Sequence, residues 1–231
     1  MCGFFCIFAK RNQSHVNIDS IIKQHFNNAS DVYIDVFDGA NIYTVYQSII
    51  GVLTQHVEIE TTMLQALSYC FYEILDNVLT HSGKIVGTVL TYYDKEKKTL
   101  RLLVADDGIG IHKSLSTEPK YKDYSEVEAL LACVKDSVTD GKGMGFGLYS
   151  TMLLAKTVGI RFEIHSGCHR LVLRGGEMLV EEVVNWQGTK VFLELHTNKE
   201  IDPNQVVTNQ TDCATQYNEA FLGTKDLDEL W

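Results

Sequence analysis

The sequence predicts an α+β fold, a two-layer sandwich in which a mixed, mainly antiparallel sheet carries helices on one face. Three observations predict it. Helical and strand-like segments alternate in mixed order, consecutive strands are joined by short hairpin connections, and the pattern does not repeat the crossovers of a doubly wound parallel sheet. A hydrophobic fraction of 45% and a charged fraction of 22% are typical of a globular chain, so the 231 residues suffice for an ordinary core.

Hydrophobic periodicity marks the elements of the first half. Residues 32–37 alternate between apolar and polar side chains and are followed by Asp-Gly, which predicts a short strand. Apolar residues recur at helical spacing over 58–81, and the Ser-Gly pair behind them is typical of a helix C-cap. Two strand-like runs, 85–93 and 100–105, follow with a polar hairpin connection between them.

The second half contains two predicted helices and a strand-rich end. Ser125 and Glu128 have the spacing of a capping box and predict a helix over 125–138. Alternate glycines precede a further helix that runs to about Val158. Residues 160–196 are expected to form several strands, with glycine-marked turns at Gly167, Gly175-Gly176 and Gln187-Gly188.

These elements divide the chain into three predicted parts. Residues 1–57 form an N-terminal α/β extension whose role the sequence does not indicate. Residues 58–196 contain the regular alternation of helices and strands and form the main domain. Residues 197–231 carry seven acidic and two basic residues with little apolar periodicity, which is typical of a mobile acidic tail.

The composition disfavours several partners and compartments. Thirty Asp and Glu residues against 20 Lys and Arg give a formal charge of −10, which disfavours binding to nucleic acid or to an anionic membrane. The six cysteines are scattered without a C-x-x-C pair, which favours a reducing compartment and disfavours a zinc site. The apolar N-terminus is too short for a membrane span. A cytoplasmic protein is therefore expected.

A carboxylate and an amide share one face of the predicted helix over 58–81. Glu73 and Asn77 are four residues apart, so their side chains lie one turn apart on the same side. A carboxylate there can orient a water or a hydroxyl group, and the amide oxygen suits a hard cation. An exposed polar face is the alternative, but the helix is otherwise strongly apolar around the pair.

An acidic residue and two alternate glycines follow the predicted strand over 100–105. The carboxylate of Asp106, at the end of a buried strand, can accept a hydrogen bond from an exocyclic amine. Gly108 and Gly110 allow the backbone to approach a flat ring closely. A simple turn from strand to loop is the alternative interpretation.

Four alternate glycines precede the helix that ends near Val158. They expose backbone N–H groups where the helix dipole favours an anion, which is typical of phosphate binding. The segment is not a Walker A loop, because no G-x-x-x-x-G-K-[ST] string occurs, and it lacks the preceding strand of a Rossmann loop. A flexible hinge is the alternative. The glycines are Gly141, Gly143, Gly145 and Gly147.

Taken in order, the three segments resemble the nucleotide site of the GHKL ATPase superfamily, which includes gyrase, the chaperone of the heat-shock ninety class, histidine kinases and MutL-type mismatch-repair ATPases. The resemblance covers roughly residues 58–196 and implies a Bergerat-type ATP-binding fold with ATP and Mg²⁺ as cofactors. It implies that Glu73 is catalytic, that Asn77 holds Mg²⁺ and that Asp106 binds the adenine amine. Residues 111–142 would form a mobile lid. The other residues implied to bind the nucleotide are His81, Gly108, Gly110, Lys142, Gly143, Gly145, Gly147, Leu148 and Thr189.

Within the superfamily, the chain is most similar to the branch of histidine kinases and anti-sigma-factor serine kinases. Residues 78–82, Val-Leu-Thr-His-Ser, follow the Glu–Asn pair as in that branch. Thr80 departs from the pattern, because many histidine kinases have a phosphate-contacting lysine at that position. Lys142, in the predicted lid, is the alternative residue for this phosphate contact. The upstream histidines lack the acidic H-x-x-x-P setting of a phosphoacceptor; they are His15, His25 and His56.

The resemblance implies one of two functions. The first is a slow ATPase or a protein kinase that phosphorylates a partner protein. The second is a non-catalytic switch, in which ATP orders the lid and creates a partner-binding surface. Glu73 favours the first, because a protein that only binds ATP does not need it. The implied ligands are ATP and ADP and the implied partner is a protein, with no nucleic acid and no membrane. The oligomeric state stays open, a homodimer included.

Overall fold

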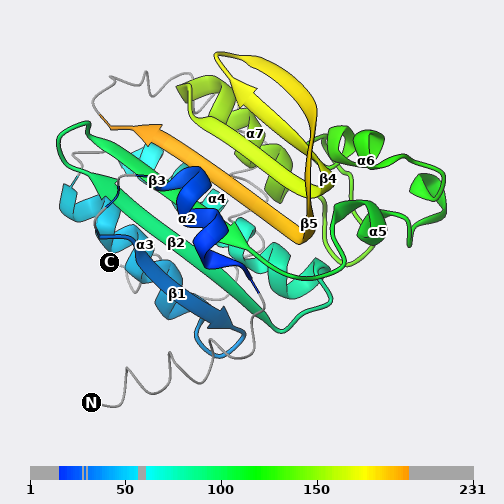
Figure 1. Ribbon diagram of the computed structural model, residues 1–231, viewed down its shortest axis with the longest axis horizontal. Coiled ribbons are helices and arrows are strands. Elements are labelled where there is room, and N and C mark those ends of the chain that lie inside the picture. Colours follow the sequence, from blue (N-terminus) through cyan, green and yellow to red (C-terminus); the bar gives the residue numbers. More distant parts are fainter. Residues whose placement is uncertain (1–15, 28, 30, 57–60, 198–231) are drawn as a thin grey trace.

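The computed structural model describes residues 16–27, 29, 31–56 and 61–197, which contain a five-stranded antiparallel sheet. The strand order is β1-β2-β3-β5-β4, so β3 is central and β1 and β4 lie at the edges. Figure 1 shows the strands side by side with the helices packed against them. The strands are β1 (Tyr33–Asp38), β2 (Val86–Asp94), β3 (Thr99–Ala105), β4 (Arg161–Arg174) and β5 (Glu177–His196).

Three long helices cover one face of the sheet, and the predicted α+β two-layer class is confirmed. They bury one continuous apolar core against the strands. Three short elements connect β3 to the last long helix. The long helices are α3 (Ile42–His56), α4 (Thr61–His81) and α7 (Gly147–Val158), and the short elements are α5 (Ile111–Leu115), η1 (Pro119–Tyr121) and α6 (Glu126–Ala132).

The apolar pattern decides which side of α4 and of each strand is buried. On α4, Leu67 and Ile74 are each 1% exposed and belong to the main core. On β3, Val104 faces the same core, whereas Leu103 faces the other side of the sheet, because successive strand residues alternate between faces. The helix ends as predicted, since Gly83 follows it with a left-handed φ of 72°.

Helix α6 begins as the sequence predicts but ends earlier. Ser125 and Glu128 form both hydrogen bonds of a capping box. The helix stops at Ala132, although the sequence predicted it to continue to Val138. Ser137 has a left-handed φ of 58°, a backbone conformation that a continuing α-helix does not allow.

A second, smaller core lies on the opposite face of the sheet, under helix α2 (Ile18–His25). Ile21 and Phe26 are fully buried there against strand residues such as Leu90 and Phe192. Figure 1 shows α2 across the sheet from α3 and α4. The sequence did not predict this helix, because eight residues give only two turns of periodicity.

Strands β4 and β5 form one long hairpin instead of the several strands predicted for 160–196. Only Gly175-Gly176 makes a turn, between the two strands. Gly167 and Gly188 lie within the strands, where the pairing register shifts on either side of Gly167. Their positive φ values accommodate a β-bulge, so glycine marks a local change of backbone there and not a chain reversal.

The predicted acidic tail lies outside the described residues except for Thr197, and so does the apolar N-terminus up to His15. From Val16 onward, the N-terminal extension supplies α2, the edge strand β1 and α3. No helix in the described part of the chain is both long enough and apolar enough to span a bilayer.

Candidate functional site

A cavity of about 350 Å³ lies between α4, the start of α7, the segment 111–146, the end of β3 and the interior of β5. The sequence-predicted residues of all three motifs meet there, although they come from separate elements. Gly108 does not line the cavity; its backbone N–H donates to Asp106 Oδ1 beneath the wall, at 2.7 Å. The predicted residues that line it are Glu73, Asn77, His81, Asp106, Gly110, Lys142, Gly143, Gly145, Gly147, Leu148 and Thr189.

Asp106 presents a buried carboxylate at the end of β3. Its residue is 3% exposed, and its backbone N–H donates to the carbonyl of Thr189 at 2.9 Å. Burial raises the pKa of the carboxyl to about 6, against the lowering effect of backbone hydrogen bonds at Gly108 and Thr189. The group is therefore a carboxylate at neutral pH and can accept a hydrogen bond from a ligand amine.

The loop that carries Asp106 is packed tightly from β5 and β4. Gly188 has a φ of 90°, and a Cβ atom there would lie 2.5 Å from Asp106 Oδ1. Ser166 Oγ donates to the Gly188 carbonyl at 3.0 Å and accepts from the Ile111 N–H at 2.9 Å. The sequence predicted a turn at Gly188 and a glycine–threonine motif with Thr189, but it did not indicate Ser166, because these contacts join residues far apart in the chain.

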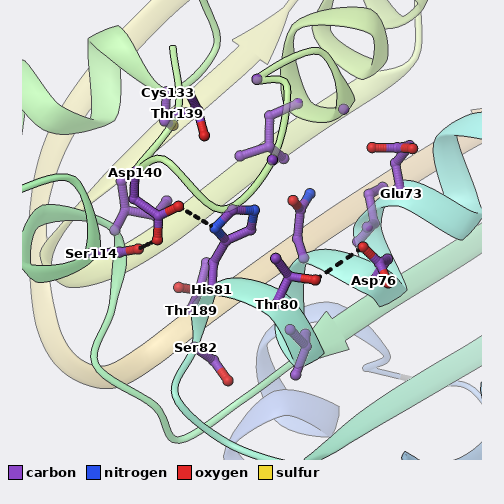
Figure 2. Close-up of a pocket in the computed structure, with 18 of the residues that line it drawn as sticks. Glu73, Asp76, Thr80, His81, Ser82, Ser114, Cys133, Thr139, Asp140 and Thr189 are labelled. Atoms are coloured by element: carbon purple, nitrogen blue, oxygen red, sulfur yellow. Dashed lines mark hydrogen bonds and ion pairs between the residues drawn. The ribbon is translucent and has the colours of Figure 1, made fainter. Parts of the chain in front are cut away.

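Glu73 and Asn77 face the cavity from α4. Burial raises the pKa of Glu73 to about 7, with a further contribution from the negative charge of Asp76 and an opposing hydrogen bond from Tyr69. The Nδ2 atom of Asn77 is buried without a hydrogen-bond partner, which is unusual and typical of a group that binds a ligand. Figure 2 shows Glu73 and Asp76 on the same helix as His81.

The start of α7 approaches the Glu73–Asn77 pair because Gly147 has no side chain. A Cβ atom on Gly147 would lie 2.5 Å from Glu73 Oε2 and 3.4 Å from Asn77 Nδ2. The N-cap residue of α7, Phe146, makes no side-chain capping hydrogen bond. The first N–H groups of this helix therefore lack a protein cap at the cavity wall, where an anion would be favoured.

Asp140 joins three segments at the cavity, and no pattern in the sequence predicted this role. Its carboxylate accepts from Ser114 Oγ at 2.6 Å and contacts His81 Nδ1 at 2.7 Å (Figure 2). Lys142 adds its backbone N–H at 3.2 Å and its Nζ at 3.5 Å. Burial alone would raise the pKa of Asp140, but the hydrogen bonds from Ser114 and His81 hold it below its usual value. Two residues predicted to bind the nucleotide, His81 and Lys142, thus bind this carboxylate.

Thr80, which replaces a lysine of the related pattern, donates to Asp76 Oδ2 at 3.1 Å, so its hydroxyl is engaged within α4 (Figure 2).

The donor groups at the cavity fit Mg²⁺ bound together with a ligand. In the part of the chain that the structure describes, no three His, Cys, Asp or Glu side chains form a metal cage. Mg²⁺ in nucleotide sites is bound mainly by phosphate oxygens and water, with one or two protein oxygens. Asn77 lines the cavity and offers one amide oxygen of this kind.

The chain has a match among known protein families. Residues 64–199, more than half of the chain, match the model of the histidine kinase-, DNA gyrase B-, and HSP90-like ATPases. A search of curated proteins found no match.

Proposed function

Because the chain belongs to the histidine kinase-, DNA gyrase B-, and HSP90-like ATPase family and so carries an ATP-binding domain of the GHKL type, we propose that it is a Mg²⁺-dependent slow ATPase or a protein kinase that phosphorylates a partner protein. The observation that carries the catalytic part is the position of Glu73, a partly buried carboxyl with a pKa of about 7 in the cavity. A general base acts best with a pKa near the working pH.

In this proposal, ATP lies along the cavity. The adenine amine donates to Asp106, and the phosphates lie at the start of α7 beside the glycine segment. Asn77 is the protein ligand of Mg²⁺. The bound ion would neutralise part of the negative charge of the phosphates. Phosphoryl transfer at such a site depends mostly on positioning and charge. Glu73 orients the attacking oxygen and takes its proton, whether the oxygen belongs to water or to a side chain of the partner.

A nucleotide-dependent switch is the second candidate, and the contacts of Asp140 favour it. Asp140 holds the glycine segment against α4 through His81 and against α5 through Ser114. A segment held through the contacts of one carboxylate can change with the nucleotide state and alter the surface that a partner meets. In this alternative, binding of ATP suffices and no bond is broken.

Isolation of the protein with its partner, followed by incubation with γ-labelled ATP, separates the two candidates. Transfer of label to the partner, or release of labelled phosphate above a Glu73→Gln control, supports catalysis. Association with the partner that requires ATP, without transfer or release, supports the switch. A protein that binds no ATP contradicts both.

The scattered cysteine pattern, without a C-x-x-C pair, supports the proposed reducing, cytoplasmic location. Cys133 and Cys168 are free thiols in the described residues, and Cys133 is buried. Burial raises the pKa of Cys133 to about 12, so this thiol, although it lines the cavity, is not a nucleophile near neutral pH.

Asp106→Asn is expected to weaken ATP binding about tenfold, because a hydrogen bond to a charged acceptor contributes roughly 1.5–3 kcal/mol. Calorimetric titration measures it. Asp107→Asn is the matched control: it removes the same charge from the next residue, which pairs with Lys84 at 3.4 Å, and should bind ATP within about twofold of wild type. Equal affinities for all three proteins would mean that Asp106 does not contact the base.

The same carboxyl predicts a pH dependence. Asp106 has a pKa raised to about 6, so it is ionised above this pH and protonated below it. Since only the carboxylate accepts well from the amine, ATP affinity should fall as the pH drops below 6, by about tenfold at pH 5. In Asp106→Asn, the fall in ATP affinity that the carboxyl causes below pH 6 should be absent. Titration of the phosphates affects the affinity of both proteins alike. Parallel profiles for the two proteins would contradict it.

Asn77→Ala is expected to reduce the affinity for Mg·ATP more than about tenfold and that for Mg²⁺-free ADP much less. The reason is that the lost amide group serves the cation. Its contribution to the binding free energy should exceed the roughly 1.5–3 kcal/mol of one hydrogen bond to a charged group, because the ion is doubly charged. Titrations with and without chelator measure the two affinities. An equal loss for both ligands would show a structural role for Asn77.

A further inference from the structure

The loop that carries Asp106 is held by two side chains of β5. Trp186, on β5, packs against the second core, and its Nε1–H donates to the backbone carbonyl of Asp106 at 3.1 Å. The next residue, Gln187, donates from Nε2 to the carbonyl of Gly108. Two successive residues of β5 therefore bind two carbonyls of the loop whose carboxylate faces the cavity.

The indole of Trp186 is in turn covered by a buried amine. Lys190 Nζ lies 4.2 Å from the ring centroid, and the residue is only 3% exposed. Burial, followed by the positive charge of Arg170, lowers the pKa of this amine to about 8. An ammonium group over an indole face, shielded from water, makes a favourable cation–π contact, which fixes the ring from one side.

Helix α2 completes the chain of contacts. Gln24 Oε1 accepts from Lys190 Nζ at 3.2 Å, and His25 lies with its ring centroid 4.6 Å from that of Phe192 on β5. Helix α2 itself contributes no residue to the cavity. A continuous set of contacts thus runs from α2 through Lys190 and Trp186 to the Asp106 loop.

We propose that Trp186 is a positioning residue for the Asp106 loop, and that helix α2 influences nucleotide affinity through Lys190 and Trp186. The inference rests on the proposed contact between Asp106 and adenine. The carbonyl that Trp186 binds belongs to the same residue as this carboxylate. Gly188 packs directly against the same loop, where a Cβ atom would lie 2.5 Å from Asp106 Oδ1.

Trp186→Phe keeps an aromatic ring in the second core, removes the N–H donor and leaves a smaller ring beneath Lys190. We expect ATP affinity to fall about three- to tenfold, as for the loss of one neutral hydrogen bond. In an Asp106→Asn background, the same substitution should change ATP affinity less than about twofold, because the contact through which it acts is already impaired. If Trp186 has a purely structural role, Trp186→Phe should lower the melting temperature equally in both backgrounds. Its effect on ATP affinity should then not depend on whether residue 106 is Asp or Asn.

Two variants on α2 test the outer part of the path without touching the sheet. Gln24→Ala removes the acceptor of Lys190 and should weaken ATP binding about twofold, since an exposed hydrogen bond contributes little. Lys23→Ala is the matched control, an adjacent exposed residue on the same helix, and should leave the affinity unchanged. If Trp186→Phe fails to fold, the ATP affinities of Gln24→Ala and Lys23→Ala decide whether α2 influences nucleotide binding.

Fluorescence of Trp186 gives an independent measure. The chain has two tryptophans, Trp186 and Trp231, so Trp231→Phe leaves Trp186 as the only indole. Its emission should change on titration with ATP, with the same midpoint as in calorimetry. Wild-type protein that binds ATP, together with unchanged affinity in Trp186→Phe or equal effects in both backgrounds, overturns this inference alone. Wild-type protein that binds no ATP overturns the proposed function first.

Discussion

Replacement of Glu73 by glutamine is expected to lower the rate of ATP turnover or phosphoryl transfer by about 10²–10⁴-fold, the usual contribution of a general base. ATP affinity should stay within about twofold of wild type. The glutamine has the same shape but cannot take a proton, and removal of a negative charge near the phosphates does not weaken binding. Single-turnover assays give the rate, and calorimetric titration gives the affinity.

Asp76→Asn is the matched control for Glu73. Asp76 also lines the cavity from α4, but it accepts a hydrogen bond from Thr80. Its charge helps to raise the pKa of Glu73, so its removal should lower that pKa and move the rise of rate with pH to lower pH, with little change in the maximal rate. If Glu73→Gln turns over as fast as wild type, Glu73 is not the base. If the wild type shows no chemistry even with its partner, the switch is favoured.

Gly188→Ala is expected to weaken ATP binding by about 10- to 100-fold and to lower the melting temperature. The new Cβ atom would overlap the carbonyl oxygen of Asp106 and crowd its carboxylate, so the loop must move and lose a hydrogen bond of roughly 1.5–3 kcal/mol. The residue has a φ of 90°, so the left-handed backbone adds a cost of its own, about 1–2 kcal/mol.

Gly176→Ala separates these two causes. Gly176 has a φ of 85°, close to that of Gly188, but no atom lies within 4 Å of a Cβ atom placed there. The two variants share the backbone cost and differ in the steric contact. We therefore expect Gly176→Ala to bind ATP like wild type. Similar affinities for both variants would show that the approach of Gly188 to Asp106 does not set the site.

The parts of the fold and site that the sequence predicted are those encoded locally. The periodicity of α4, the capping box of α6 and the glycines before α7 each depend on residues within a few positions of one another. The positions of Glu73 and Asn77 on one helical face follow from spacing alone. The family resemblance then placed Asp106 and the glycines at the same cavity, where the structure has them.

The remaining parts depend on contacts between distant residues. Asp140 meets His81 across 59 positions of sequence, and Trp186 meets Asp106 across 80. No local pattern encodes such a pair. Gly188 was misread as a turn because glycine reports a backbone conformation, and only the strand opposite it determines whether that conformation makes a bulge or a reversal.

The hydrogen bonds around Asp140 also affect how fast a bound nucleotide would dissociate. The contacts of Asp140 to His81 and Ser114 hold the glycine segment beside the cavity, and each hydrogen bond contributes about 0.5–1.5 kcal/mol. In the proposed enzyme, a nucleotide beneath this segment is expected to leave faster when both contacts are open. Such closure lengthens the residence of product as well as substrate. In the proposed enzyme, release of ADP then becomes a candidate for the step that limits turnover, and a partner that pulls Asp140 away from α4 would act as an exchange factor.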